Sequence, residues 1–179
     1  MPELKYQNEG GPDLAQCFDL VRRITRPNAP QVLRLLDYVV FNALIGNHDA
    51  HAKNFSLLYA GKVPVLAPFY DTLSTAVYPN LTPKMAMKIG SQYKFSAVQA
   101  KHWDQFAQAV GLSIAQARKR ILELAKQIPL TAGKLYSAPE SGFTGHALVK
   151  QIIGLIEQRA ALTIRRLTDP STDAGTSEE

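Results

Sequence analysis

Hydrophobic residues recur at helical spacing near the start of the chain. The first apolar series is Leu14, Cys17, Phe18, Val21 and Ile24. Residues three and four positions apart share one face of an α-helix, so this series predicts an amphipathic helix with Pro12 near its first turn. The helix is expected to end before Pro27, because a proline inside a helix removes a hydrogen bond and clashes with the preceding turn.

A second apolar segment has almost no polar face. It begins near Pro30 and reads VLRLLDYVVFNALIG, with hydrophobic residues on almost every side after Tyr38. A helix of that kind is buried all round in a globular domain. Gly46 is expected to end it, because glycine readily adopts the left-handed conformation that closes a helix.

The pattern changes from helical to extended after this second helix. The segments Ser56 to Tyr59 and Val63 to Leu66 are short, rich in β-forming residues and separated by a stretch that includes Gly61. Together they predict a β-hairpin. From Thr72 to Phe95, proline, glycine, asparagine and serine are scattered through the sequence, which predicts a loop with little regular structure.

Three further helices are predicted in the second half of the chain. The first covers about 96–110 and is closed by Gly111. Ser113 is expected to cap the second, which should end before Pro129. The third runs from about Gly145 to Leu167. The hydrophobic pattern therefore predicts a mainly α-helical domain with one short hairpin.

Composition agrees with an ordinary soluble globular domain of 179 residues, 46% of them hydrophobic and 20% charged. The longest strongly apolar run, Tyr38 to Ile45, is far shorter than the roughly 20 residues that cross a bilayer. No charged-then-apolar pattern opens the given sequence, so a secretory signal is not expected. Cys17 is the single cysteine, so an internal disulfide is excluded and a cytoplasmic location is expected.

Charge adds three expectations. The net charge is +5, although residues 169–179 contain four acids and no base. This acidic tail is expected to be disordered, which leaves residues 1–168 as the folded domain. Basic residues do not alternate with aromatic ones in any run, so direct nucleic-acid binding is not expected. The triplet Arg118 to Arg120 is interpreted as the solvated face of a helix.

Most candidate catalytic and metal-binding residues lie in the segment NALIGNHDAHAKNFSLLY. Asp49 and Asn54 lie five residues apart, Lys53 precedes the asparagine, and Asp71 follows the predicted hairpin. Protein kinases use these residue types in this order: an aspartate that accepts the proton of the attacking hydroxyl, an asparagine that holds magnesium, and a later aspartate that holds the metal at the phosphates. Mg²⁺ takes further oxygen ligands from phosphate and water, so one or two protein oxygens suffice. Lys53 can offset the charge that develops on the transferred phosphoryl group.

The pieces GNHDAHAKNFSLL and LAPFYDTLS resemble the catalytic core of the HipA-like serine/threonine kinases, bacterial kinases that are usually toxins of toxin–antitoxin modules. The upstream piece KYQNEGGPDL is similar to the sequence just before the family's catalytic helices. The resemblance implies that Asp49 is the catalytic base and that Asn54 and Asp71 bind Mg²⁺. It also implies that His51, Lys53 and Tyr70 line the phosphates of ATP. The implied fold is a kinase C-terminal lobe whose short β-hairpin carries the catalytic loop and the metal-binding aspartate.

A kinase also needs an N-terminal lobe with a phosphate-covering loop and a lysine on a strand. Only 48 residues precede Asp49, they read as helices, and they contain no G-x-G-x-x-G motif. The chain is therefore expected to be a C-terminal lobe alone and to be inactive in isolation. The resemblance implies three partners: the missing N-terminal lobe, a DNA-binding antitoxin, and a protein substrate such as an aminoacyl-tRNA synthetase.

Two other functions remain open from the residues themselves. His48, Asp49, His51 and Asp71 could form an HD-type metallohydrolase site, in which a transition metal activates water. Alternatively, the chain is a non-catalytic module that binds a partner through exposed apolar surface. In the simplest interpretation Asp49 and Asn54 only cap turns, and His48, which the resemblance gives no role, is a surface residue.

Overall fold

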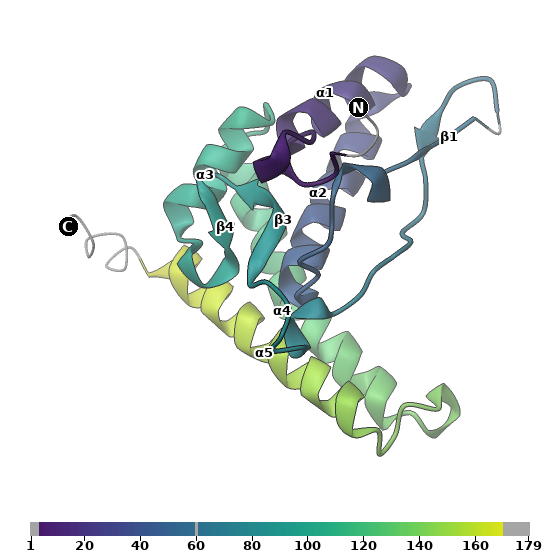
Figure 1. The fold of residues 1–179 in the computed structure, drawn as a ribbon. Coiled ribbons are helices and arrows are strands. Elements are labelled where there is room, and N and C mark those ends of the chain that lie inside the picture. The colour runs from purple at the N-terminus through teal and green to yellow at the C-terminus, as the bar shows by residue number, and fades with distance from the viewer. Residues whose placement is uncertain (1–3, 60, 170–179) are drawn as a thin grey trace.

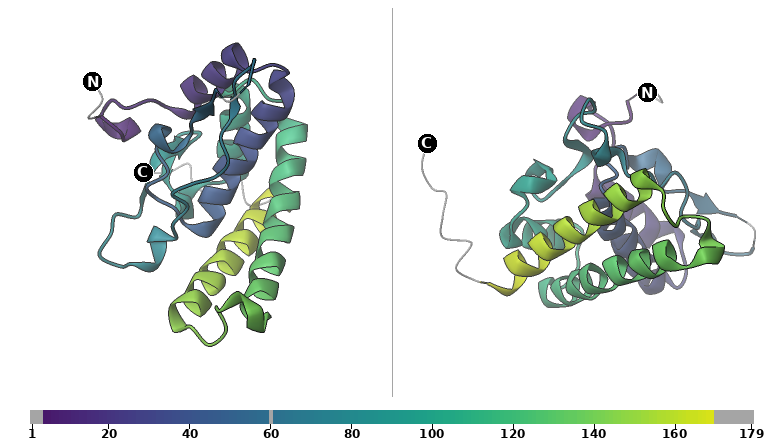
Figure 2. Two further views of the ribbon diagram at one scale, coloured as in Figure 1. Left: turned by 90° about the vertical axis from the view of Figure 1, so that its right-hand side faces the viewer. Right: turned by 90° about the horizontal axis from the view of Figure 1, so that it is seen from below.

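Helices form the frame of the molecule (Figure 1). The computed structural model describes residues 4–59 and 61–169, and this part of the chain contains five α-helices. They are α1 (Leu14–Ile24), α2 (Asn28–Ile45), α3 (Ala100–Ala109), α4 (Ile114–Ser137) and α5 (Ala147–Thr168). α4 and α5 form a long antiparallel hairpin (Figure 2). Because α2 packs against α1, α4 and α5, it lies at the centre of the hydrophobic core.

α1 begins with a reciprocal cap. The Asp13 carboxylate accepts a hydrogen bond from the backbone N–H of Gln16 (2.8 Å), and the backbone N–H of Asp13 donates to Oε1 of Gln16 (3.0 Å). These bonds satisfy donors that the start of a helix otherwise leaves without partners. Leu14, Phe18 and Val21 are buried, which confirms the predicted apolar face.

α2 is buried on most of its surface, as its sequence predicts. Leu35, Leu36 and Leu44 have no exposed area, and burying a side chain of this size contributes on the order of 2 kcal/mol. Gly46 follows the helix with φ of +77°. A Cβ at this position would lie 2.7 Å from the Cβ of Ala76. The left-handed backbone and the lack of space therefore both require glycine.

The predicted hairpin is confirmed, although its strands are short. β1 (Leu57–Leu58) pairs antiparallel with β2 (Val65–Leu66), and Leu57 lies opposite Leu66. The side chain of Leu66 is 1% exposed and joins the main core. The hairpin is thereby fixed to the helices, and the chain that leaves β2 leads directly to Asp71.

The prediction of a loop over Thr72–Phe95 is wrong for its second half. β3 (Lys84–Ile89) and β4 (Gln92–Lys94) form a second antiparallel hairpin. The middle residues of β3, Met85 to Met87, are all buried, so the strand does not show the usual alternation of buried and exposed positions. Methionine, alanine and lysine also have little intrinsic preference for strands. The strand therefore forms because of its tertiary contacts, which the local sequence does not reveal.

α4 is longer than predicted. Its start is confirmed, because Oγ of Ser113 accepts a hydrogen bond from the Gln116 backbone. Its predicted end before Pro129 is wrong, since the helix continues to Ser137 with Pro129 inside it. Extensive packing against α5 offsets the hydrogen bond that the proline cannot donate.

The triplet Arg118 to Arg120 is not simply solvated surface. Arg118 makes a two-point contact with Asp104 of α3, and Arg120 makes another with Asp37 of α2. Of the three, Lys119 is exposed, whereas both arginines are half-buried. The two arginines thus join α4 to its neighbouring helices.

The remaining predictions at the C-terminal end have mixed outcomes. α3 begins at Ala100, a few residues later than predicted, after a 3-10 turn over Phe95–Ala97, and α5 lies close to its predicted range. Asp169 follows α5, whereas the rest of the predicted acidic tail, 170–179, lies outside the described residues. Across 4–59 and 61–169, no helix combines the length and the apolar character needed to cross a bilayer.

Candidate active site

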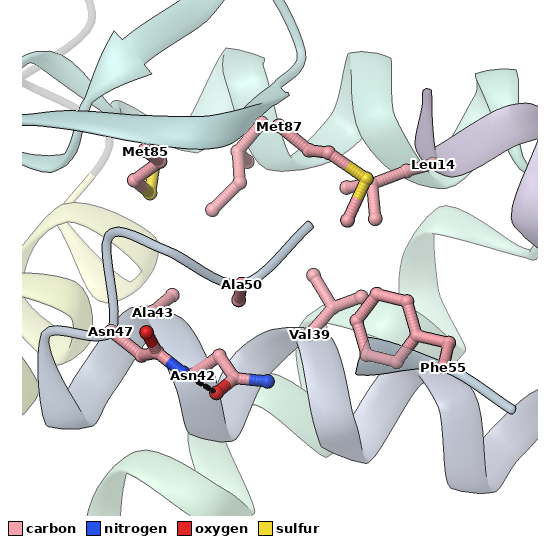
Figure 3. A pocket seen from close by; sticks show the side chains of 10 residues that line it. Leu14, Val39, Asn42, Ala43, Asn47, Ala50, Phe55, Met85 and Met87 are labelled. Atoms are coloured by element: carbon pink, nitrogen blue, oxygen red, sulfur yellow. Dashed lines mark hydrogen bonds between the residues drawn. The ribbon is translucent and has the colours of Figure 1, made fainter. Parts of the chain in front are cut away.

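Asp49 lies on a short loop that leaves the end of α2. The loop passes between α2 and β3, where Ala50 faces Val39 and Ala43 on one side and the side chains of β3 on the other (Figure 3). The space left among these side chains is only about 30 Å³, roughly enough for one water molecule. Tight packing therefore holds the loop from both sides.

Asn47 connects this loop to the residue that follows the first hairpin. Its Oδ1 accepts a hydrogen bond from the backbone N–H of Asp49 (3.1 Å), and its Nδ2 donates to the backbone carbonyl of Asp71 (3.1 Å). The same Nδ2 donates to Oδ1 of Asn42 in α2 (2.9 Å), and both asparagines are buried. One buried amide thus holds the two aspartates at a defined separation, a role that the sequence analysis did not foresee.

Asn54 and Asp71 are in direct contact. Nδ2 of Asn54 donates to Oδ2 of Asp71 (2.7 Å), and Oδ1 of Asn54 accepts from the backbone N–H of His51 (2.9 Å). Asp71 has φ of +55°, the only positive value among the non-glycine residues in the described part of the chain. Such a backbone costs on the order of 1 kcal/mol or more and persists only where neighbouring contacts impose it. Here the bond from Asn47 to its carbonyl is such a contact.

Tyr6, from the N-terminal segment, contacts Asp49, the expected catalytic base. Its hydroxyl donates to Oδ1 of Asp49 (2.6 Å). This hydrogen bond and the nearby negative charge raise the pKa of the Tyr6 phenol. The sequence analysis did not assign a role to this residue, and the one available signal was the resemblance of the piece KYQNEGGPDL that contains it.

The three residues expected to line the phosphates have different surroundings. His51 is 7% exposed, and its ring packs edge-on against Tyr6 with centroids 6.0 Å apart. Burial lowers the pKa of His51, while Asp49 and Asp71 are both close enough to oppose that shift. Lys53 is exposed. The exposed hydroxyl of Tyr70 contacts the backbone carbonyl of Lys53 and Oγ of Ser56, so it holds the loop that carries Lys53.

His48 is buried, so the expectation of a surface residue is wrong. It is 8% exposed, and its Nδ1 lies 3.0 Å from the carbonyl oxygen of Thr82. Its own carbonyl accepts a hydrogen bond from the backbone N–H of Ala86 in β3 (2.8 Å). The second hairpin, which was not predicted, therefore covers one side of the loop that carries Asp49.

The arrangement offers oxygen ligands rather than a histidine-rich metal site. Asp71 provides a carboxylate and Asn54 an amide oxygen, Oδ1, which here accepts from the His51 backbone. Mg²⁺ accepts both kinds of oxygen as ligands. In the described residues, no group of three or more histidine, cysteine, aspartate or glutamate side chains lies close enough to hold a metal ion. The alternative of an HD-type metallohydrolase, which needs several such ligands, thus receives no support from the structure.

Comparisons with known proteins find a matching family and relatives that are named as kinases. The model of the HipA-like C-terminal domain matches residues 1–132. The chain is 39% identical over 161 residues to the Sinorhizobium fredii protein named "Putative kinase Y4mE", covering 90% of this chain and 38% of that protein. It is 27% identical over 119 residues to the serine/threonine-protein kinase toxin HipA of Shewanella oneidensis, covering 66% of this chain and 27% of the toxin.

A solved structure shares the fold. The complex of Shewanella oneidensis HipA, HipB and operator DNA contains a chain that matches 91% of this one with a TM-score of 0.75 and 20% sequence identity, over 40% of its own length. The chain thus spans less than half the length of these relatives. Because the family model covers most of the chain, we conclude that the chain belongs to the family of the HipA-like C-terminal domain.

Proposed function

We propose that the chain is the catalytic C-terminal lobe of a HipA-like serine/threonine kinase, which transfers the γ-phosphate of ATP to a serine or threonine of a protein. The observation that carries the proposal is the hydrogen-bonded connection of Asp49, Asn47, Asp71 and Asn54. It joins one carboxylate that can act as a base to a carboxylate–amide pair that can bind a cation. Kinase chemistry requires these two groups to be separate but close.

Asp49 is the proposed general base. The hydroxyl oxygen of the substrate attacks the γ-phosphorus, the bond from that phosphorus to the bridging oxygen of ADP breaks, and Asp49 takes up the hydroxyl proton. Tyr6 orients the carboxylate through the bond to Oδ1, and Asn47 holds the backbone beneath it. A base that is already oriented avoids part of the entropic cost of reaching the reactive geometry.

Asp71 and Asn54 are the proposed ligands of Mg²⁺. The bond from Nδ2 of Asn54 to Oδ2 of Asp71 (2.7 Å) brings the two side chains together at an exposed position. The ligand atoms would be a carboxylate oxygen of Asp71 and Oδ1 of Asn54, which here accepts from the His51 backbone, and the cation would keep water and phosphate oxygens as its other ligands. When bound, Mg²⁺ neutralises negative charge on the phosphates. We further propose that Lys53, His51 and Tyr70 line the phosphates, with Tyr70 acting through its contact to the Lys53 backbone.

Complete activity is proposed only for the chain together with an N-terminal lobe. The relatives named as kinases are more than twice as long as the part that this chain matches, and ATP needs a sheet and a phosphate-covering loop as well. The solved relative is a complex of HipA with HipB and operator DNA. By analogy we propose an antitoxin partner and a toxin role, with a protein as the phosphorylated substrate.

The metal site can be tested on this chain alone. Paramagnetic Mn²⁺ should broaden the amide NMR signals around Asn54 and Asp71, and Asp71→Asn should abolish that broadening. The matched control is Asp19→Asn, which neutralises an exposed aspartate on α1 and should leave the broadening intact. Equal broadening in the Asp71→Asn variant would contradict the proposed ligands.

The assignment of the base needs the complete kinase. Asp49→Asn should reduce transfer of radiolabelled γ-phosphate by on the order of 10²–10⁴-fold, because the amide cannot take up the proton. Asp19→Asn serves again as the control and should retain the original rate. Undiminished transfer by the Asp49→Asn enzyme would exclude this residue as the base.

A further inference from the structure

α5 lies against the end of α2, on the far side of the catalytic loop from the first hairpin (Figure 1). A Cβ on Gly46, at the end of α2, would lie 2.9 Å from Cδ2 of Leu155 in α5. One turn further along α5, Nη1 of Arg159 donates to the backbone carbonyl of Ala43 (2.8 Å). Nη2 of the same guanidinium lies 2.8 Å from Nε2 of His48. α5 therefore touches the residue that directly precedes Asp49.

Arg159 is not paired with an acidic side chain. None of the salt bridges within residues 4–59 and 61–169 includes it. Its guanidinium instead stacks over the ring of Phe95, 4.5 Å from the centroid, and contacts a carbonyl at the C-terminal end of α2. That end carries a partial negative charge, which together with the ring stabilises the cation. Burial lowers the pKa of Arg159 to about 10, so the group still carries its charge at neutral pH.

The contacts with Arg159 and with the Thr82 carbonyl together determine the protonation state of His48. A guanidinium has only donors, so Nε2 of His48 must be the acceptor. The proton of the neutral ring then resides on Nδ1, which donates to the Thr82 carbonyl at 3.0 Å. Both ring nitrogens are thus used, and the ring can neither flip nor gain a proton without losing one of its two bonds. The backbone of His48 is held as well, by Thr75 and Ala86.

We propose that Arg159 is a positioning residue for the catalytic loop: through His48 it fixes the backbone from which Asp49 projects. This inference rests on the proposed function for its effect on phosphoryl transfer, but its structural part does not. It assigns a role in the site to α5, which lies beyond the residues 1–132 that the family model matches.

The first test reads the tautomer of His48 directly. Long-range ¹H–¹⁵N NMR spectra of the chain at neutral pH should show the proton on Nδ1 and a bare Nε2. Arg159→Met should remove the hydrogen bond to Nε2, so the Nε2 nitrogen signal and the amide signals of His48 and Asp49 should move, while the Thr82 carbonyl keeps the proton on Nδ1. Unchanged Nε2 and amide signals in folded Arg159→Met protein would overturn the proposal, whether or not the complete protein is a kinase.

Two other arginines on α5 provide matched controls. Arg166 donates to the backbone carbonyls of Val98 and Ser96, so Arg166→Met removes similar anchoring bonds without touching His48. Arg165 is exposed, and Arg165→Met removes only surface charge. Both variants should keep the original Nε2 signal of His48 and the amide signals of His48 and Asp49, even if Arg166→Met lowers the melting temperature. A movement of these signals in Arg166→Met equal to that in Arg159→Met would mean that general loosening of α5 is the cause, and it would also overturn the proposal.

The second test measures phosphoryl transfer by the complete kinase. Arg159→Met should lower kcat by about 10-fold with little change in KM for ATP, because displacing a reactive group by about 1 Å can cost up to 10²-fold. His48→Gln should retain most activity, since its amide offers an acceptor to Arg159 and a donor to Thr82, whereas His48→Leu offers neither. Equal kcat values for the Gln and Leu variants would contradict the positioning role. If the original enzyme shows no transfer at all, the proposed function fails while the NMR result still decides the structural inference.

Discussion

At the scale of single residues, buried polar side chains determine the geometry of the site. Asn47 is 4% exposed and holds the backbone of Asp49, the backbone of Asp71 and the side chain of Asn42 at once. A buried group that loses such partners carries the full cost of its desolvation. The largest losses of folding stability are therefore expected on substitution of these asparagines rather than of the charged residues that they position.

Asn47→Ala should lower the free energy of unfolding by about 1–3 kcal/mol, because it leaves Oδ1 of Asn42, the backbone carbonyl of Asp71 and the backbone N–H of Asp49 without this partner. Urea unfolding followed by circular dichroism measures this loss. The control is Asn80→Ala at an exposed position, which should change stability by less than about 0.5 kcal/mol. Similar losses in both variants would show that the Asn47 contacts contribute little.

The lowered pKa of buried His48 leads us to expect that the protein loses stability in mild acid. Burial, and then the charge of Arg159, lower its pKa in the folded protein, whereas the unfolded value is about 6.5. The unfolded chain therefore binds more protons, so the stability contributed above about pH 6.5 is lost as the pH falls through the folded pKa. Thermal melts from pH 7.5 to pH 5 should show a smaller decline for His48→Gln than for the original chain. His146→Gln at an exposed site should leave the decline unchanged, and a flattened profile there would contradict the assignment to His48.

At the scale of elements, the β3–β4 hairpin, which was not predicted from the sequence, has a large influence on the site. Its first strand covers the loop that carries Asp49 and donates a backbone hydrogen bond to His48. The turn that joins β3 to β4 contains Gly90 with φ of +59°. A Cβ there would lie 2.5 Å from the backbone oxygen of His102. The position of the hairpin on α3 thus depends on this one glycine.

Gly90→Ala should destabilise the protein by about 2 kcal/mol or more, because both the left-handed backbone and the contact with His102 oppose a Cβ. Gly133→Ala is the matched change inside α4, where an added Cβ meets nothing within 4 Å. It should raise stability by about 0.5–1 kcal/mol, because alanine favours a helix interior. Thermal unfolding of the two variants in parallel measures both effects, and a neutral Gly90→Ala would show that the hairpin can move away from α3.

At the scale of the whole molecule, large apolar side chains are exposed along the segment that follows the first hairpin. Leu73, Tyr78 and Leu81 are each more than half exposed, at 57%, 51% and 52%. They follow Asp71 in the sequence by at most ten residues. A second lobe that closes over the proposed metal site would cover them, so their exposure is expected to promote self-association of the chain alone.

Sedimentation velocity at increasing concentration should therefore show association of the chain, and Leu73→Ser with Leu81→Ser should reduce it. The control replaces Leu130 and Leu135 by serine. These leucines are also exposed, at 67% and 51%, but lie toward the far end of α4. An equal reduction in both double variants would mean that the surface near the site has no special tendency to associate.

Short-range sequence information was enough for most of the frame. Periodicity, the Pro and Gly stops and the Ser113 cap located the helices, and the first hairpin was located by its turn. The β3–β4 hairpin and the continuation of α4 through Pro129 were missed, because both depend on packing against distant elements. For the same reason the burial of His48 could not be read from its neighbours in the sequence.

The sequence by itself determined the family, the order of the candidate residues and the helical class, because motifs and hydrophobic periods are local properties. Only the tertiary structure decided how the candidate residues are held. Tyr6 reaches Asp49 across 43 positions, Asn47 reaches Asp71 across 24, and Arg159 reaches His48 across 111. Hydrogen bonds of this kind have no local signature, since they form only after the core around α2 has brought distant segments together.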